Sequence, residues 1–391
     1  MNKGLRLCIL MFIFVFLAGC WDRTELNDLA LISGIAFDKT EDNRIETTVQ
    51  IIIPQNQGEG GKTGGALQKT IVRSEAGINI SDALSKLQRK IPRKIFWGQC
   101  KTFIFSKDVA ESGIKEEFDF LVRHPQPRER AYMFVSAEKA AEALEVFPSI
   151  ESSSSQVLEQ LANLQVGITV TLEQLSMMLK GEARTAVLPL VRILPKNKSA
   201  KPFQTIPYID GTVLIKKDKM IGKITEKTTH GLMWILNEVD EFTLSFAMDK
   251  DEEVVSLKPV KARVKLIPAI SNDKWMMTIK IKAEGDIIQN ETDLNPMNPK
   301  VLNMMNEAFK EDIEGRIKKA LQVIQQENKT DVLGFATAFH RKYPHQWEKN
   351  KDRWDEMFPR VEVTLDIKTS IQRPGLINSP GGIPEEEVQK Q

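Results

Sequence analysis

Hydrophobic and polar residues alternate along four segments in the second half of the chain. An alternation of period two places every other side chain on one face of a strand, so each segment predicts a β-strand with one buried face. We expect these strands to form a roughly four-stranded antiparallel sheet. The apolar positions are Phe242, Leu244, Phe246 and Met248; Val260, Ala262, Val264 and Leu266; Met277, Ile279, Ile281 and Ala283; and Val361, Val363, Leu365 and Ile367.

Between the third and fourth of these segments, the apolar residues repeat with a helical period. The spacing predicts a long helix over about 299–326 and a second helix over about 331–341. Helices at this place in the chain can cover the apolar face of the sheet, which is the α+β arrangement. We therefore predict a C-terminal α+β domain over residues 203–373, built from this sheet and a long helix pair.

The first half mixes strands and helices without a regular alternation. Residues 29–37 and 45–53 flank a polar turn and predict a β-hairpin. Further strands are expected at 99–105, 131–135 and 185–194, and helices at 81–91, 107–123 with a break at Gly113, 138–146, 156–165 and 171–180. This gives an N-terminal α+β region over 20–196, in one body or two lobes. The whole chain is then multidomain α+β, with mixed or antiparallel sheets covered by helices.

Three segments have the composition of connections. Residues 55–65 are rich in glycine and predict a flexible surface loop. Residues 195–202 are rich in lysine and proline, and we place the domain boundary there. Residues 374–391 contain prolines, glycines and the run Glu385-Glu386-Glu387, which predicts a loose tail.

The N-terminus has the pattern of a secretory signal. Lys3 and Arg6 precede an uncharged apolar stretch over 7–18, which is shorter than the roughly 20 residues of a membrane-spanning helix. It ends in Leu17-Ala18-Gly19-Cys20, which resembles the lipobox of bacterial lipoproteins. The resemblance implies that residues 1–19 are a removed signal peptide and that Cys20, the first residue of the mature chain, carries a diacylglyceryl and fatty-acyl lipid. Two acyl chains anchor a protein stably.

Composition and charge restrict the function classes. The chain has 54 Lys and Arg against 53 Asp and Glu, a net charge of +1, which gives no general case for binding nucleic acid. Of its three cysteines, Cys8 leaves with the signal peptide and Cys20 is acylated, so Cys100 has no partner for an intramolecular disulfide.

Candidate catalytic and metal-binding residues are sparse. His340 and His345, with Glu348 nearby, are separated by Pro344, and no second cluster completes a tetrahedral ligand set. No nucleophile elbow or clustered Ser/His/Asp arrangement is visible. We therefore expect a protein that is not an enzyme, with no metal and no cofactor besides the lipid.

Two surface features leave alternatives open. Polar residues of three predicted strands would share one face of the C-terminal sheet. This face is either a docking surface, for a partner or for anionic lipid headgroups, or a solvated surface with cross-strand ion pairs. Trp347, Trp354 and Phe358 are either an interface patch or, as we prefer, core. The residues of the polar face are Lys261, Arg263, Lys265, Lys280, Lys282, Glu362, Thr364, Asp366 and Lys368.

Several blocks together resemble one known family, the Ger(x)C lipoproteins, which are C subunits of spore germinant receptors. The blocks follow one another in the family's order along nearly the whole mature chain. They are Cys20-Trp21-Asp22-Arg23-Thr24-Glu25-Leu26-Asn27, Gly34-Ile35-Ala36-Phe37-Asp38, Phe118-Asp119-Phe120-Leu121-Val122-Arg123, Gly211-Thr212-Val213-Leu214, Lys219-Met220-Ile221-Gly222, Gly231-Leu232-Met233-Trp234 with Glu238, Asp331-Val332-Leu333-Gly334-Phe335 and His340-Arg341-Lys342-Tyr343-Pro344.

The resemblance implies a role and a place in the cell. It implies a non-enzymatic, lipid-anchored subunit of a nutrient germinant receptor, needed for receptor assembly and signalling in germination. The partners it implies are two integral membrane subunits of the A and B types, and the location is the outer face of the spore inner membrane. It assigns no germinant-binding residue. It also implies a three-domain α+β architecture.

Two other classes remain open on the sequence alone. An extracytoplasmic solute-binding lipoprotein of a transporter would show two α/β lobes with repeated strand–helix crossovers. An envelope enzyme would show a deep polar cleft with perturbed carboxylates.

Overall fold

The computed structural model describes residues 25–373 except for 54–69, 199–200, 202, 240–241 and 249–252. The predicted signal peptide, Cys20, the predicted loop at 55–65 and the predicted tail at 374–391 therefore lie outside the described residues.

Nine strands of the first part of the chain form one mixed sheet, in the order β3-β2-β1-β5-β6-β7-β8-β9, with β4 also paired to β1. Neighbours from β1 to β7 in the middle are parallel, and the pairs at both ends are antiparallel. The predicted hairpin is confirmed as the β1–β2 pair. The strands are β1 (Leu29–Lys39), β2 (Ile45–Ile52), β3 (Thr70–Gly77), β4 (Lys94–Phe96), β5 (Thr102–Ser106), β6 (Tyr132–Ser136), β7 (Thr185–Ile193), β8 (Pro207–Lys216) and β9 (Lys219–Thr225).

The helices of this part begin where the sequence offers side-chain caps. The side chains of Asn79, Ser106, Ser153 and Thr171 each accept a hydrogen bond from a backbone N–H of the first turn. The predicted break at Gly113 is confirmed, because this residue has a φ of 124° and separates α3 from α4. The helices are α2 (Ile80–Gln88), α3 (Lys107–Ser112), α4 (Lys115–Arg123), α5 (Ala140–Glu145), α6 (Ser154–Asn163) and α7 (Leu172–Lys180).

The segment at 195–202, where we place the domain boundary, lies between two paired strands. Strands β7 and β8 pair antiparallel from Thr185↔Lys216 to Ile193↔Pro207, so residues 195–202 connect two neighbours of one sheet. The first sheet extends to Thr225, beyond this segment. A composition rich in lysine and proline indicates a connection on the surface. It does not distinguish a loop between two paired strands from a linker between two domains.

The second sheet contains the four strands that the alternation predicted, in the order β10-β11-β12-β13. They are β10 (Phe242–Ala247), β11 (Val254–Ser271), β12 (Lys274–Asn290) and β13 (Glu362–Arg373). The turn between β11 and β12 consists of Asn272 and Asp273, both with positive φ, as a two-residue hairpin requires.

One pairing in this sheet corrects the prediction of an antiparallel sheet, because β13 runs parallel to β12. The chain between these strands forms the helices α9 (Pro299–Leu321), α10 (Phe335–Lys342), α11 (Pro344–Asn350) and α12 (Trp354–Met357). Such a long helical crossover carries the chain back to the end where β12 began, and the next strand then runs in the same direction. The α+β class itself is confirmed.

Both late helices are present, with one shifted start. The buried residues of α9, Val301, Met305, Phe309, Ile313 and Ile317, are those of the predicted apolar stripe, and a π-helical turn (Gln322–Glu327) continues this helix. The second helix begins at Phe335 rather than 331. Its start is fixed by the Asp331 carboxylate, which accepts hydrogen bonds from the backbone N–H groups of Leu333, Phe335 and Ala336.

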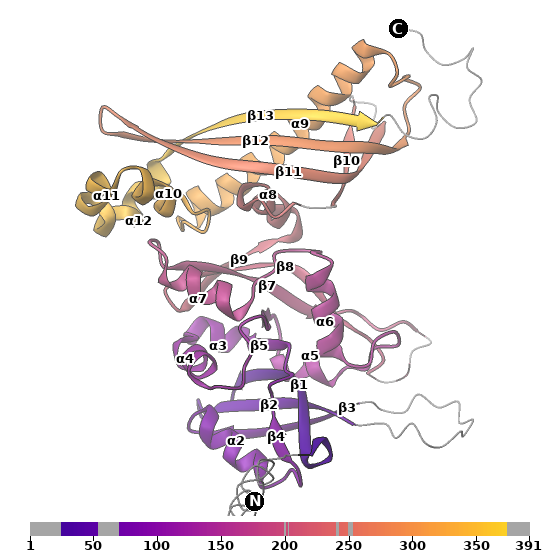
Figure 1. Cartoon of the computed structure of the whole chain (residues 1–391), viewed down its shortest axis with the longest axis vertical. Helices are drawn as coiled ribbons and strands as arrows, with labels where there is room; N and C mark the ends of the chain where they lie inside the picture. Colours follow the sequence, from indigo (N-terminus) through magenta and orange to yellow (C-terminus); the bar gives the residue numbers. More distant parts are fainter. Residues whose placement is uncertain are drawn as a thin grey trace, which may run out of the picture.

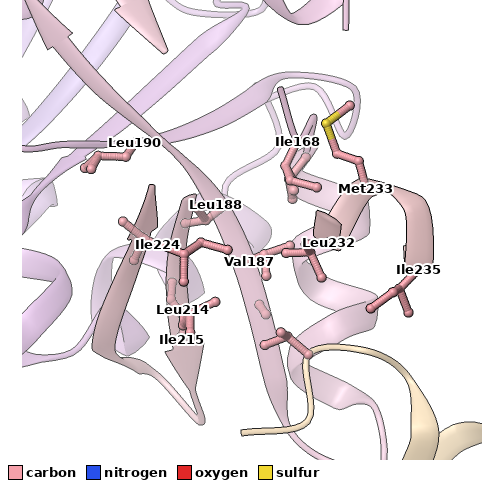
Figure 2. Packing of buried hydrophobic residues seen from close by; sticks show 14 of the residues in the cluster. Ile168, Val187, Leu188, Leu190, Leu214, Ile215, Ile224, Leu232, Met233 and Ile235 are labelled. Atoms are coloured by element: carbon pink, nitrogen blue, oxygen red, sulfur yellow. The ribbon is translucent and has the colours of Figure 1, made fainter. Parts of the chain in front are cut away.

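The two sheets lie one beyond the other along the long axis of the molecule, with α8 (Glu226–Leu236) and α9 in the second half (Figure 1). One continuous hydrophobic cluster includes residues of both halves. Figure 2 shows part of it, where Leu232, Met233 and Ile235 of α8 lie with the buried side chains of β7, β8 and β9. Helix α8 also approaches α9 closely at Gly231, where a Cβ atom would lie 2.3 Å from the carbonyl oxygen of Arg316.

Polar contacts add to this junction. The Thr185 hydroxyl donates to the carbonyl oxygen of Asp331 at 2.6 Å, and Lys216 forms an ion pair with Asp355 at 2.8 Å. Glu182, just after α7, accepts a hydrogen bond from the Trp347 indole and lies 2.7 Å from Nδ1 of His340. The first sheet is therefore held to the helices of the second half by side chains from both.

Candidate functional site

The exposed face of the second sheet brings together the polar residues that the alternation predicted. Register places Lys265 of β11 opposite Lys280 of β12, which in turn lies opposite Asp366 of β13. Lys280 and Asp366 form an ion pair at 3.0 Å, and nearer the start of β13 Lys274 pairs with Glu362 at 3.4 Å. This part of the face matches the alternative of cross-strand ion pairs.

One step further along the strands, three cations lie directly opposite one another. Arg263 of β11 faces Lys282 of β12, and Lys282 faces Lys368 of β13. Neighbouring strands are about 4.8 Å apart, so the row spans about 10 Å. We call these three residues the cationic row. All three side chains are exposed, and none forms an ion pair with a carboxylate among the residues that the structure describes.

Like charges directly opposite each other on a sheet destabilise it. The cationic row contains two such pairs in succession, whereas the neighbouring row ends in Asp366. The cationic row thus costs folding stability and leaves a concentrated positive charge toward solvent. This combination makes the row a candidate contact for an anion.

The cationic row borders a hollow of about 580 Å³. Its wall on one side is the segment after α8, where Asn237 adopts a left-handed conformation and accepts a hydrogen bond from the backbone N–H of Val264. Lys261 adds a further cation, and Glu284 is the carboxylate among the lining residues. Glu284 accepts a hydrogen bond from Gln372 at 3.4 Å and forms no ion pair within the described part of the chain.

A second hollow, of about 440 Å³, lies beside the first sheet and is lined mostly by polar residues. Behind it, the buried Gln50 side chain accepts hydrogen bonds from Ser33 and Ser155 and donates to Ser154 and to the carbonyl oxygen of Leu144. Since the oxygen and the nitrogen of the Gln50 side-chain amide both have partners, this network fixes α6 against the sheet. It needs no ligand to satisfy it.

Two of the residues considered as metal ligands have other partners. His340 contacts Glu182, while Glu348 forms an ion pair with Lys351 at 2.6 Å. Within the described residues, no group of three or more His, Cys, Asp or Glu side chains has the geometry to hold a metal ion.

The aromatic residues considered as an interface patch are core. Trp347, Trp354 and Phe358 are buried, and the rings of Trp347 and Trp354 meet edge to face at 5.1 Å between centroids. The Trp354 indole donates a hydrogen bond to the fully buried Asp331 carboxylate. Sequence reasoning missed Asp331 as the common acceptor of this cluster, although an aspartate at the start of a predicted helix is a capping signal.

Burial perturbs the pKa of two further groups. It raises the pKa of the Cys100 thiol to about 12, so this cysteine is protonated and unreactive at neutral pH. It raises the pKa of Glu238 to about 7, against a hydrogen bond from the backbone of Thr169 that acts in the opposite direction. Glu238 follows α8 and Thr169 precedes α7, so this contact lies between the two halves.

Across the residues that the structure describes, no helix combines the length and hydrophobicity needed to cross a bilayer.

Two family profiles match the chain one after the other. Residues 22–193 match the spore germination protein N-terminal domain, and residues 210–375 match the C-terminal domain described as spore germination B3/GerAC like. The two profiles meet near the β7–β8 connection.

Relatives of known name match over nearly their full length. Spore germination protein KC of Bacillus subtilis (strain 168) is 28% identical, over 97% of this chain and 98% of its own. Spore germination protein B3 of the same strain is 22% identical, over 95% and 98%, and spore germination protein GerQC of Bacillus cereus is 23% identical, over 93% and 98%. The crystal structure of the GerBC protein superposes with a TM-score of 0.56 at 20% identity, over 87% of this chain and 97% of that one. This structural likeness shows the fold.

Proposed function

Because the chain belongs to the Ger(x)C family of spore germination proteins, we propose that it is the lipid-anchored C subunit of a nutrient germinant receptor. In this proposal the lipid on Cys20 holds the folded body at the outer face of the spore inner membrane. There it assembles with two integral membrane subunits of the A and B types and contributes to signalling, without catalysing a reaction. Confinement to one membrane raises the effective concentration of the partners for one another.

The observation that carries the proposal is the position of the lipobox. Cys20 follows Leu17-Ala18-Gly19 and lies only a few residues before Leu26–Asp28, the first described helical turn. An anchor at Cys20 would therefore keep the first sheet close to the bilayer. Family membership over both halves of the chain supports the germination role of the same body.

The architecture supports a binding and assembly role over the solute-binding alternative. A solute-binding lipoprotein would have two α/β lobes, whereas this chain has one mixed sheet and one mainly antiparallel sheet joined by a continuous core. Of the titratable groups that line the first hollow, Lys101 and Glu159 form an ion pair with each other at 2.5 Å.

The anchor is tested with Cys20→Ala, and Cys8→Ala is the matched control, since it makes the same change inside the segment that would be removed. We expect Cys20→Ala to leave an unacylated precursor that retains residues 1–19, and spores with a reduced response to nutrients. Cys8→Ala should leave processing and response unchanged. Intact-mass spectrometry and the fall of spore optical density after nutrient addition measure both. Normal processing and germination of the Cys20→Ala spores would contradict the anchor.

The partners are tested separately by crosslinking and capture of the tagged chain from spore membranes in mild detergent. Two polytopic membrane proteins of the A and B types should be recovered with it. Recovery of a transporter permease in their place would favour the solute-binding alternative and overturn the receptor assignment.

A further inference from the structure

The cationic row of Arg263, Lys282 and Lys368 has no anion among the described residues, and its surroundings say what kind of group can meet it. The positions beside it on the same face are polar or charged: the ion pair of Lys280 and Asp366 lies on one side, and Glu284 and Ser370 lie on the other. A face of this kind offers charge and hydrogen bonds but little apolar area. The occupant must therefore be recognised by negative charge, and a short run of carboxylates on an extended chain fits a straight row of cations across three strands.

The chain itself continues from the strand that carries one of these cations. After Arg373 at the end of β13, the charged residues that follow are Glu385, Glu386, Glu387 and Lys390. The carboxylate run thus belongs to a segment tied covalently to the edge strand of the same sheet. In Figure 1 the C-terminal end of β13 lies at the end of the second sheet.

The reach of this segment is sufficient. Lys368 lies about 17 Å back from Arg373 along β13, at about 3.3 Å per residue. The stretch between Arg373 and Glu385 can extend to about 40 Å. The glutamates can therefore return to the cationic row without distortion of β13. A tethered segment also competes at an effective concentration in the millimolar range, which a free acidic peptide rarely reaches.

We propose that the carboxylate run Glu385–Glu387 of this chain docks on the cationic row of Arg263, Lys282 and Lys368 and covers it. The contact is electrostatic, so it weakens as salt shortens the Debye length. It neutralises cations that otherwise face one another, and any acidic partner must displace it to reach the row. This inference is independent of the proposed function, because it concerns the purified chain alone.

Zero-length carbodiimide crosslinking tests the contact on the purified chain of residues 21–391. This reagent joins a carboxylate to an amine only when the two touch, and peptide mass spectrometry identifies the pair. We expect links from the Glu385–Glu387 peptide to Lys282 and Lys368 in the monomer, and their loss at about 1 M salt, where the Debye length is about 3 Å. Lys319, an exposed lysine of α9 without an ion pair among the described residues, is the control and should give no link.

Amine labelling gives a second readout that does not depend on crosslinking chemistry. The triple variant Glu385→Gln, Glu386→Gln, Glu387→Gln should raise the acylation rates of Lys282 and Lys368 about threefold or more if the segment covers the row at least two-thirds of the time. The rate at Lys319 should not change. Reversing the charges on both sides, with the row changed to glutamate and residues 385–387 to lysine, should restore the links.

Three results would overturn the proposal. The first is a set of crosslinks from Glu385–Glu387 that avoids the row or is evenly spread over exposed lysines. The second is a triple variant whose labelling rates at Lys282 and Lys368 equal those of the unaltered chain. The third is links found only in crosslinked dimers, which would make a second copy of the chain the occupant.

Discussion

Glu238 gives the sharpest test of how the two halves are held together. Its carboxyl group lies in the junction after α8, largely buried, with a hydrogen bond from the backbone of Thr169. Burial raises its pKa from 4.5 to about 7, so the folded protein holds a proton there that the unfolded chain releases. The substitution Glu238→Gln keeps the size and a hydrogen-bond acceptor for Thr169 but removes the ionisation.

The sign of the pH effect follows from this proton. Between pH 4.5 and about 7 the folded state binds more protons at Glu238 than the unfolded state, so the free energy of unfolding decreases as pH rises through this window. A shift of this size corresponds to at most about 3.4 kcal/mol, and partial solvent exposure reduces it, so we expect about 2 kcal/mol. Glu238→Gln should therefore match the unaltered chain only below about pH 4, exceed it by less than about 1 kcal/mol at pH 5, and exceed it by about 2 kcal/mol at pH 8.

Urea unfolding followed by tryptophan fluorescence measures this difference at pH 5, 6, 7 and 8. Using the difference between variant and unaltered chain cancels the contributions of all other titratable groups. Glu41→Gln, a change at an exposed turn residue, is the matched control and should give a difference near zero at every pH. A stability difference between Glu238→Gln and the unaltered chain that stays constant from pH 5 to 8 would refute the reasoning.

Two further substitutions probe the second half. Gly231→Ala places a Cβ atom 2.3 Å from the carbonyl oxygen of Arg316 and should force α8 and α9 apart, so we expect urea unfolding to show a stability lower by about 1–3 kcal/mol. The control is Gly315→Ala in α9, where the added Cβ atom meets nothing within 4 Å. It should raise the stability by about 0.5–1 kcal/mol. Equal effects of the two would contradict the close helix contact. Asp331→Asn removes one of the two oxygens that accept the backbone and Trp354 hydrogen bonds. We therefore expect the free energy of unfolding to fall by about 2–3 kcal/mol and the tryptophan emission spectrum to shift. An unchanged spectrum with unchanged stability would show that the carboxylate does not organise this cluster.

The elements that have a local periodic pattern were predicted from the sequence. The alternation over Val260–Leu266 and Met277–Ala283 predicted β11 and β12, and the stripe from Val301 to Ile317 predicted α9, because burial on one face imposes its period on the residues themselves. The hairpin of β8 and β9 was not predicted. Its turn, Lys217 and Asp218, contains no glycine or asparagine, although Lys217 adopts a φ of 60°.

Strand direction and strand register could not be predicted from the sequence, because both depend on distant parts of the chain. The direction of β13 depends on where the helices after β12 end, and no pattern within Val361–Ile367 records it. The same holds for the cationic row. The alternation predicted that Arg263, Lys282 and Lys368 share a face, but only the register of the pairing shows that they lie directly opposite one another.

The positions of the two candidate interaction regions bear on which anion the cationic row can meet. The described chain begins at the end of the molecule formed by the first sheet, and the second sheet lies at the opposite end of the long axis (Figure 1). If Cys20 carries the lipid, the anchor lies at the end of the first sheet, and the continuous core between the halves fixes the second sheet at the far end of the molecule. The carboxylates of Glu385–Glu387 are tied covalently to β13 of the second sheet, so they are available to the row wherever the anchor holds the molecule.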